Sequence, residues 1–419
     1  MDRTIFVNVG VIALTVSSLA YAVPDACDAF GELVGINPLE TGDRVFFGSV
    51  TKDFLGRSIA TGDFTGDGIA DVVLGAGGSD LNGGGSGTAF LLKGPITAGA
   101  ALNVNLAQAA FTGATVNAAA GWSVANAGDL NADGIDDIAI GAPSGNGVVG
   151  SSGVAYVMFG GPSLSGLYNL GTSASVTFGG AAAGDSFGDT VQGVGDVNGD
   201  GIDDFAVGAP LAEVGALTNA GKAYLFFGPL AGTYAATSAN VTLGGVQANG
   251  EFGTALLGRV DTDGDGKSDV IVGSSKANAG GSFAGAAYVF LGRATFPATI
   301  ATSAADSTLT GAAYNRAGWS LASAGDTDGD GRDDFWVGAP QFGSTKRGAA
   351  FLVPGGTSGL VALASVSRMR VVGENANDLA GSAIAGDIDF DNDGHADVVI
   401  GGERADGAVA GSGAAWVIH

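Results

Sequence analysis

GDVNGDGIDDFAVGAP, residues 195–210, joins an acidic loop pattern to a strand pattern without a break. Side-chain oxygens stand at Asp196, Asn198, Asp200 and Asp204. The apolar run that follows them is typical of a buried strand. We therefore expect a polar loop that leads directly into a strand, and the same arrangement recurs along the chain.

The pattern occurs six times at a nearly constant period. The first aspartates of the six copies are Asp63, Asp129, Asp196, Asp261, Asp326 and Asp389. Successive copies start 66, 67, 65, 65 and 63 residues apart. A period of this length indicates a repeat architecture, in which each repeat is one small unit that buries its apolar surface against its neighbours.

Each repeat holds four short runs rich in Val, Phe, Tyr and Ile, separated by Gly, Asp, Asn and Ser, which is the pattern of short strands. No segment shows the period of a long amphipathic helix. Four strands per repeat match one blade of a β-propeller, where radial packing covers both faces of each sheet. The sequence therefore predicts an all-β fold, a six-bladed β-propeller of four-stranded antiparallel blades, with a seven-bladed ring as the alternative.

The two ends of the repeat region predict how the ring closes. The sixth repeat stops at its third strand, residues 413–419, whereas residues 44–49 hold a spare strand, RVFFGS, before the first loop. Placed at the outer edge of blade six, residues 45–47 would complete that blade and protect an unpaired edge. We expect the propeller domain to span residues 45–419.

The six loops share one set of oxygen donors. Numbered from its first aspartate, each loop has an oxygen-bearing side chain at positions 1, 3, 5 and 9, a glycine at position 6, and a backbone carbonyl at position 7. Such a set suits a hard cation of calcium size, and the glycine permits the turn that gathers the ligands. No cluster of Cys or His offers soft ligands, and Mg²⁺ ranks second because it keeps more of its waters. We therefore expect about six structural Ca²⁺ ions, one for each loop.

The calcium loops are expected at residues 63–71, 129–137, 196–204, 261–269, 326–334 and 389–397. The predicted ligands, with position 7 acting through its backbone carbonyl, are Asp63, Thr65, Asp67, Ile69, Asp71, Asp129, Asn131, Asp133, Ile135, Asp137, Asp196, Asn198, Asp200, Ile202, Asp204, Asp261, Asp263, Asp265, Lys267, Asp269, Asp326, Asp328, Asp330, Arg332, Asp334, Asp389, Asp391, Asp393, His395 and Asp397.

Position 12 distinguishes these loops from an EF-hand. An EF-hand needs a glutamate at that position and a helix on either side, whereas position 12 of the third loop is Val207, inside a strand. A sensor that opens a pair of helices is therefore excluded. The alternative in which Asp and Gly only form turns does not explain why six loops keep their oxygens in one register.

Charge and composition exclude other classes. The chain has 42 acidic and 17 basic residues, a formal net charge of −25, so nucleic acid is not an expected partner because no basic stripe is available to neutralise phosphates. The hydrophobic share of 46% is that of a folded protein. Beyond the N-terminus, no apolar run approaches the length of a membrane span.

The N-terminal segment predicts export. Residues 1–22 have the pattern of a signal peptide, with Arg3 before an apolar stretch and a small-x-small cleavage site that ends at Ala22, and a single membrane anchor is the alternative. Residues 23–44 are expected to form a tail, and Cys27 within it is the only cysteine, so no intrachain disulfide is possible. We expect a mature chain without a transmembrane segment that is secreted, exposed at the cell surface or periplasmic.

The repeat resembles the FG-GAP repeat of the integrin α-subunit N-terminal β-propeller and its bacterial relatives. Phe-Gly stands at residues 187–188 and 252–253, and Gly-Ala-Pro at residues 141–143, 208–210 and 338–340, with a calcium loop between the two elements. The resemblance covers residues 45–419 and implies that the calcium is structural and that ligands bind the opposite face. Integrin propellers have seven blades where we count six repeats, and the sequence shows no leg domains, inserted adhesion domain or transmembrane helix. An integrin proper is therefore not expected.

These observations predict a non-catalytic binding or cell-adhesion-type module. We expect it to be a monomer that binds an unknown protein or glycan ligand. The ligand surface is expected in loops that follow the GAP element, such as 141–153 and 208–221. An enzyme is not expected, because His395 and His419 are the only histidines and no nucleophile elbow or Ser/His/Asp arrangement is found. The alternatives are a structural matrix or surface component and a propeller-type lyase or hydrolase that works with carboxylates alone.

The four tryptophans could stack on sugars, but their positions favour structural roles. Trp336 and Trp416 stand inside strand runs. Trp122 and Trp319 occupy the FG position, which packs between blades in the resembled family. We expect all four to be structural.

Overall fold

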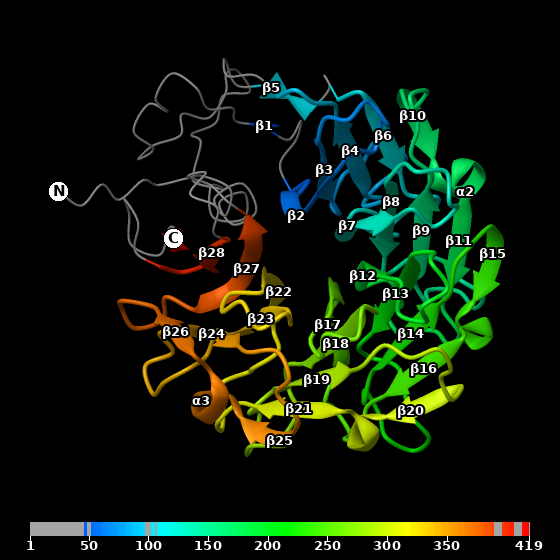
Figure 1. Cartoon of the computed structure of the whole chain (residues 1–419). Coiled ribbons are helices and arrows are strands. Elements are labelled where there is room, and N and C mark those ends of the chain that lie inside the picture. The colour runs from blue at the N-terminus through cyan, green and yellow to red at the C-terminus, as the bar shows by residue number, and fades with distance from the viewer. Residues whose placement is uncertain are drawn as a thin grey trace.

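The chain folds into a ring of β-sheets around a central axis. The computed structural model describes residues 46–47, 52–96, 102–104, 107–388, 396–405 and 413–418. Six sheets radiate from the axis, and in each sheet the strands follow one another outward (Figure 1). The predicted all-β, six-bladed β-propeller is confirmed. None of the helices in the described part of the chain has the length and apolar character needed to cross a bilayer.

The first three blades each have five strands, which follow one another from the axis outward. Blade one comprises β2 (Leu55–Gly62), β3 (Asp71–Ala76), β4 (Thr88–Leu92), β6 (Ala109–Thr112) and β10 (Gly166–Asn169). Blade two comprises β7 (Ser123–Gly128), β8 (Asp137–Ala142), β9 (Val154–Met158), β11 (Val176–Gly179) and β15 (Gly232–Ala235). Blade three comprises β12 (Thr190–Gly195), β13 (Asp204–Ala209), β14 (Lys222–Phe226), β16 (Val241–Gly244) and β20 (Thr299–Ala301).

The remaining blades repeat this order. Blade four comprises β17 (Phe252–Val260), β18 (Asp269–Ser274), β19 (Ala286–Phe290), β21 (Ser307–Thr310) and β25 (Gly359–Ala362). Blade five comprises β22 (Leu321–Gly325), β23 (Asp334–Ala339), β24 (Ala349–Val353) and β26 (Met369–Val372). The described strands of blade six are β27 (Ala380–Ile388), β28 (Asp397–Gly402) and β29 (Ala414–Ile418).

The second strand of a blade is buried on both faces. In blade three, Phe205 and Val207 of β13 pack into a cluster with Phe178 of blade two. Ala206, which points the other way, packs into a cluster with Val272 of blade four. Because neighbouring blades cover both faces, such a strand is apolar at consecutive positions instead of alternating, which is the pattern found in the sequence.

A fifth strand on blades one to four was not predicted. β10 pairs in parallel with β6, so the outermost strand of blade one comes from the second repeat. In the same way, β15, β20 and β25 pair with the fourth strands of blades two, three and four, and each comes from the repeat that follows. These strands are short, begin near a glycine or alanine and are largely exposed at their first residues, so their sequence lacks the apolar signal of a strand. Short helical turns follow them, including α2 (Leu170–Ser173) and α3 (Leu363–Val366). Each repeat therefore reaches back to cover the edge of the blade before it.

The ring closure involves the short strand β1 (Phe46–Phe47). It pairs in parallel with β5 (Leu102–Asn103), a strand of the first repeat, with Phe46 opposite Leu102. The parallel pair β6–β10 and its equivalents always join the fourth strand of one blade to a strand of the next repeat. β1 thus makes the parallel contact that a fourth strand of blade six would make. The predicted pairing of residues 45–47 with β29 stays a prediction, because residue 45 and residues 48–51 lie outside the described residues.

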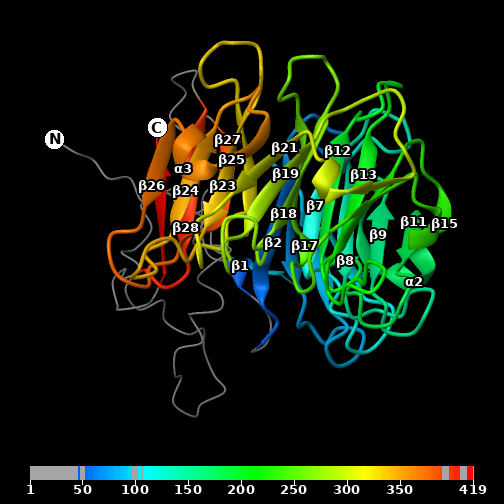
Figure 2. The ribbon, with the colours of Figure 1, turned by 90° about the horizontal axis from the view of Figure 1, so that it is seen from below.

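The strand order separates two kinds of loop onto two faces of the ring. Strand one of each blade runs towards its acidic loop and strand two returns from it, so these loops share one face (Figure 2). We call it the acidic face. The loops between strands two and three (77–87, 143–153, 210–221, 275–285 and 340–348), which we call the GAP loops, lie on the other face together with the connectors between blades. We call this second face the FG face.

Candidate metal centre

Five of the six predicted loops are described in full. Each joins strand one of its blade to strand two, at residues 63–71, 129–137, 196–204, 261–269 and 326–334. In the sixth loop, Asp389, Asp391, Asp393 and His395 lie outside the described residues, and Asp397 begins β28. The acidic face therefore carries five copies of one loop whose geometry can be compared.

Each loop wraps around the carboxylates at positions 1 and 5. In the third loop, the backbone N–H of Asp200 donates to Oδ1 of Asp196 at 3.0 Å, and that of Gly201 donates to Oδ2 of Asp196 at 2.7 Å. Asp200 in turn accepts a bond from the N–H of Ile202 at 3.0 Å. Gly201 has φ of +88°, a conformation that glycine adopts without strain. The other four described loops repeat these bonds.

The side chains at positions 1, 3 and 5 converge. In the fourth loop, the ligand oxygens of Asp261, Asp263 and Asp265 all lie within 4.8 Å of one another. The fifth loop forms the same group with Asp326, Asp328 and Asp330. The first three loops carry Thr or Asn at position 3, a neutral oxygen in place of the third carboxylate. An all-oxygen donor set with two or three like charges this close fits a hard divalent cation and offers nothing to a metal that prefers nitrogen or sulfur.

Basic side chains offset part of this charge. Lys267 Nζ lies 2.7 Å from Asp265, and Lys93 Nζ lies 2.9 Å from Asp67. These ion pairs are at the surface, where solvent screens the attraction and the ordering of two long side chains offsets it. They therefore leave most of the repulsion within the loops to be balanced in another way.

Position 9 is the most buried of the predicted ligand side chains in each loop that the structure describes in full. Asp204 begins β13 and exposes 0% of its surface. Its Oδ2 accepts a bond from the N–H of Val197 at 3.0 Å, and its Oδ1 accepts one from the N–H of Gly228 at 2.9 Å. Asp71, Asp137 and Asp269 make the corresponding two contacts, one within the loop and one at the end of strand three. The residue thus anchors its loop to the blade, and its oxygens retain further lone pairs for a cation.

Burial determines the charge behaviour of position 9 in loops two, three and four. Loss of hydration raises the pKa of Asp137 and of Asp204 to about 7, although two N–H donors act in the opposite direction in each case. The pKa of Asp269 is raised to about 6 for the same reason. A divalent cation beside these carboxylates would favour their charged form. Position 9 is therefore a structural anchor whose ionisation a bound cation would assist.

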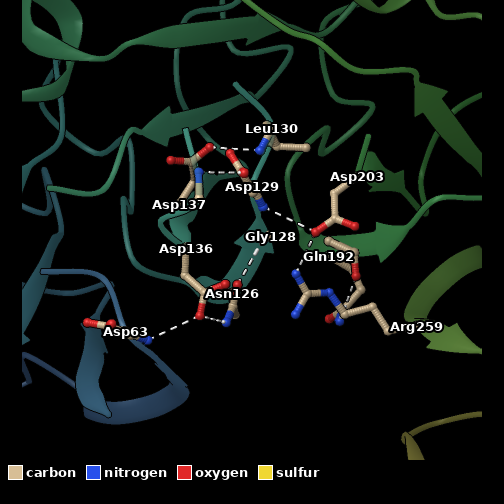
Figure 3. A network of polar contacts seen from close by, with 12 residues as sticks. Asp63, Asn126, Gly128, Asp129, Leu130, Asp136, Asp137, Gln192, Asp203 and Arg259 are labelled. Atoms are coloured by element: carbon tan, nitrogen blue, oxygen red, sulfur yellow. Dashed lines mark hydrogen bonds and ion pairs between the residues drawn. The ribbon is translucent and has the colours of Figure 1, made fainter. Parts of the chain in front are cut away.

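Carboxylates at position 8 connect neighbouring loops. Asp136 of blade two accepts a hydrogen bond from the backbone N–H of Asp63 in blade one at 3.1 Å. Asp203 of blade three accepts one from the N–H of Asp129 in blade two, also at 3.1 Å (Figure 3). Asp333 of blade five does the same for Asp261 of blade four at 2.8 Å. In each case the first residue of one loop is held by the next blade.

Sequence reasoning missed this role of position 8. The signal was present as an Asp-Asp pair in three repeats, at residues 136–137, 203–204 and 333–334. The position varies, with Ser268 in the fourth repeat, so it did not belong to the invariant pattern of oxygens. At that seam the contact is made by the backbone instead, since the Ser268 N–H donates to the carbonyl of Asp196 at 3.0 Å.

The tryptophans do not all have the expected structural positions. Trp336 is buried as predicted. Trp122 is half-buried beneath Arg57 of blade one, whose guanidinium carbon lies 3.5 Å from the ring centroid. Trp319 differs, because 41% of its surface is exposed on the FG face. At the position of Arg57, blade four carries the shorter Thr254, so Trp319 lacks a comparable cover from the preceding blade.

Comparison with known proteins recognises the same unit. Five segments match the FG-GAP repeat family, at residues 55–92, 120–158, 187–226, 252–290 and 317–353. In blades one to five, each match begins at strand one or up to four residues before it and ends at the last residue of strand three. The unit that defines the family therefore contains the acidic loop and the two strands that it joins.

Relatives of known name share part of this sequence. Integrin alpha pat-2 of Caenorhabditis elegans is 33% identical over 238 residues, which is 54% of this chain and 18% of that protein. Integrin alpha-IIb of Homo sapiens is 39% identical over 158 residues, 36% of this chain and 14% of that protein. Phosphatidylinositol-glycan-specific phospholipase D of Rattus norvegicus is 31% identical over 183 residues, 43% of this chain and 21% of that protein. The matched region is thus at most 21% of the length of any of these three relatives.

The family matches and the structure agree on the boundaries of the unit. Five consecutive blades of the six-bladed ring coincide with five family matches, and integrin α subunits are among the relatives. The chain therefore contains five FG-GAP repeats, which form five consecutive blades of a β-propeller similar to that of integrin α subunits.

Proposed function

We propose that the chain is an exported, non-catalytic binding or adhesion-type module whose ring is stabilised by structural Ca²⁺. The observation that carries this proposal is the acidic face, where five loops repeat one arrangement of oxygen donors and carboxylates link three of the seams between them. A face built in this way serves to hold the ring together and leaves the FG face to a ligand. The integrin α subunits among the relatives support a binding role.

The loop residues have separate tasks in this proposal. In the third loop, the ion would be held by Asp196, Asn198, Asp200 and Asp204 together with the carbonyl of Ile202. When bound, it supplies positive charge that offsets the repulsion among the carboxylates. The chain itself orients the ligands, because backbone N–H groups already fix both oxygens of position 1. The same tasks fall to the corresponding residues of the other loops.

Export is part of the proposal and rests on residues 1–22. The proposed division is a signal peptide at residues 1–22, a tail at residues 23–44 and the propeller at residues 45–419. The extracellular domains implied by the integrin relatives agree with this location. The N-terminal residue of the protein recovered from the secreting cell tests the division, and a mature chain that still begins at Met1 would contradict it.

A non-catalytic role is proposed because the described residues include no histidine and the sequence has no nucleophile elbow. Both histidines, His395 and His419, lie outside the described residues. The carboxylates that gather on the acidic face already accept loop hydrogen bonds. The match to the phospholipase D covers 21% of the length of that protein. We therefore do not extend the activity in its name to this chain.

A binding array tests the proposal. The whole protein is applied to immobilised glycans and matrix proteins, once with Ca²⁺ and once with a chelator. We expect binding to at least one ligand in Ca²⁺ and weaker binding in chelator, because loss of the ions loosens the blades. Absence of binding under both conditions would favour the structural matrix component instead. If chelator leaves the melting temperature unchanged, the proposed structural role of Ca²⁺ is wrong.

A further inference from the structure

The FG face carries an aromatic cluster where blades four and five meet. Phe283 belongs to the GAP loop of blade four, and Tyr314, Arg316 and Trp319 belong to the connector that leads into blade five. We call these four residues the seam cluster. The ring centroids of Phe283 and Tyr314 lie 6.3 Å apart, and the Arg316 guanidinium carbon lies 5.6 Å from the Trp319 centroid. The N–H of Arg316 donates to the carbonyl of Phe283 at 3.2 Å, so the loop and the connector are fixed to each other.

The three rings of the seam cluster face solvent. Phe283 is 45% exposed, Tyr314 61% and Trp319 41%. Aromatic side chains contribute most when they are buried, so the fold gains little from three of them at one surface site. A group of exposed apolar rings beside polar residues is typical of an interaction site.

The backbone beneath these rings is strained. Phe283 and Tyr314 have φ of +50° and +67°, in the left-handed region that bulky side chains disfavour. Other repeats have the same conformation with different residues. The position of Tyr314 is held by Lys52, Asn117, Gly184, Asn249 and Asn377, and that of Phe283 by Gly85, Ser151, Asn219 and Lys346. Asn and Gly adopt this conformation at low cost. The left-handed conformation is thus common to the repeats, and the two aromatic side chains are what distinguishes this seam from the others.

Charge on this part of the FG face is also unusual for the chain. The GAP loop 275–285, the connector 311–319 and the GAP loop 340–348 contain no carboxylate. Their four cations are Lys276, Arg316, Lys346 and Arg347. Lys276 forms an ion pair with Glu251 at 2.6 Å. The other three cations have no carboxylate within these loops to pair with. The preceding FG-face segments, residues 180–189, 210–221 and 245–253, hold four carboxylates and no cation.

We propose that the seam cluster binds an acidic polysaccharide that carries uronate carboxylates. This inference rests on the proposed binding function and names its ligand class. Sugar rings present apolar C–H faces that pack on exposed aromatic rings, and a uronate carboxylate suits the planar guanidinium of Arg316. Lys346 and Arg347, on the next blade of the same face, would attract further carboxylates of a chain that crosses the seam.

The surface favours a polysaccharide over other acidic polymers. A peptide needs a groove or an open strand edge, whereas this seam is closed by hydrogen bonds between loop and connector, such as that from the Tyr314 N–H to the carbonyl of Ser282 at 2.8 Å. A nucleic acid would extend its phosphates over the neighbouring segments, where carboxylates repel them. A glycan requires only exposed rings with a few cations beside them.

The test uses the full-length protein in Ca²⁺. A glycan array with uronate-bearing, sulfated and neutral members is followed by affinity measurements on hyaluronan and heparosan oligosaccharides, each compared with its methyl ester. We expect at least tenfold tighter binding of the acid than of the ester. The variant Phe283→Asn/Tyr314→Asn should weaken binding of the acid at least tenfold, and Arg316→Gln should weaken the acid more than the ester.

The variants keep loss of binding separate from loss of folding. Asparagine already stands at the Tyr314 position of two neighbouring seams, so the double variant should melt at the same temperature as the parent or higher. Val148→Asn, which replaces a 62% exposed residue elsewhere on the FG face, should bind like the parent. If the double variant binds a uronate glycan as tightly as the parent does, the seam cluster is not the binding site. If the protein binds only ligands without uronates, the proposed ligand class is wrong and the proposed binding function stands. If it binds no glycan or protein at all, the ligand class and the binding function are both wrong.

Discussion

The carboxylate of Asp203 in blade three accepts a hydrogen bond from the backbone N–H of Asp129 in blade two at 3.1 Å. Asp129 is position 1 of its acidic loop, so a ligand position in one blade is held by the next. Oδ2 of Asp203 also lies 2.9 Å from Nη2 of Arg259 in blade four, and one side chain thus connects three blades (Figure 3). Whatever orders an acidic loop therefore also orders the seam beside it.

Asp203→Ala should weaken Ca²⁺ binding in blade two, although Asp203 is not a predicted ligand. The N–H of Asp129 loses its charged acceptor, which costs about 1.5–3 kcal/mol where the group stays dry. Urea unfolding in Ca²⁺ measures the loss, and Glu213→Ala, the same change of charge at an exposed site on the FG face, is the control. In a double-mutant cycle with Arg259→Ala we expect a coupling of about 0.5–1 kcal/mol, because the pair is partly exposed. Equal stability of the Asp203 and Glu213 variants would contradict the link.

Positions 5 and 9 of one loop should respond differently to the same substitution. Asp200→Asn removes a charge from the ligand group, so we expect it to lower stability in Ca²⁺ and to have little effect in chelator. Asp204→Asn leaves one of two buried N–H donors, of Val197 or Gly228, without its acceptor, so it should cost about 1–3 kcal/mol under both conditions. Thermal unfolding with and without Ca²⁺ separates the two patterns. If both variants lose stability only in Ca²⁺, position 9 acts as a ligand alone and the anchoring role is wrong.

Without Ca²⁺, stability should fall as the pH rises from about 4 to about 7. The pKa of Asp137 and of Asp204 is about 7 in the folded chain and about 3.9 in an unfolded one, so folding favours the protonated form. That contribution is complete below the unfolded pKa and is lost as the pH passes through the folded pKa.

Calcium should reverse this dependence on pH, because the ion competes with the proton for the same carboxylates. Apparent Ca²⁺ affinity should therefore rise through pH 7. Melting curves from pH 4 to 8, in Ca²⁺ and in chelator, measure both effects. Asp137→Asn/Asp204→Asn should flatten the chelator curve. If the calcium-free protein gains stability between pH 5 and 7, these two carboxylates do not determine how its stability depends on pH.

Much of the ring could be predicted from the sequence because period and burial give strong signals. The six repeats and the buried second strands, such as β13, follow from regular spacing and continuous apolar runs. The parallel strands β10, β15, β20 and β25 could not be predicted in the same way. They are held to a neighbouring blade by backbone hydrogen bonds, and that pairing leaves little mark on side-chain hydrophobicity.

The candidate site was predictable to a similar degree. Oxygen spacing located the five described loops and their position between strands one and two. The role of Asp203 was not visible, because it depends on the placement of a loop in the neighbouring blade, a contact 74 residues apart in sequence. The exposure of Trp319 was missed for a related reason, since it is set by the residue that the neighbouring blade places beside it.

The N-terminal strand should be needed for a closed ring. A chain that begins at residue 45 should fold like the mature protein, whereas one that begins at residue 51 lacks β1 and would leave edges unpaired near β5 and β29. We expect the shorter chain to melt at a lower temperature and to aggregate, as measured by calorimetry and light scattering. Equal melting temperatures for the two truncated chains would show that the ring closes without β1.

The most direct test of a calcium-stabilised ring is the titration of chelator-treated protein with Ca²⁺, followed by calorimetry of binding and by the melting temperature. We expect several ions to bind each chain, up to about six, and the melting temperature to rise with Ca²⁺ concentration, as it must when a ligand binds only the folded state. A protein that binds no Ca²⁺ and melts at one temperature with and without chelator would contradict the central claim.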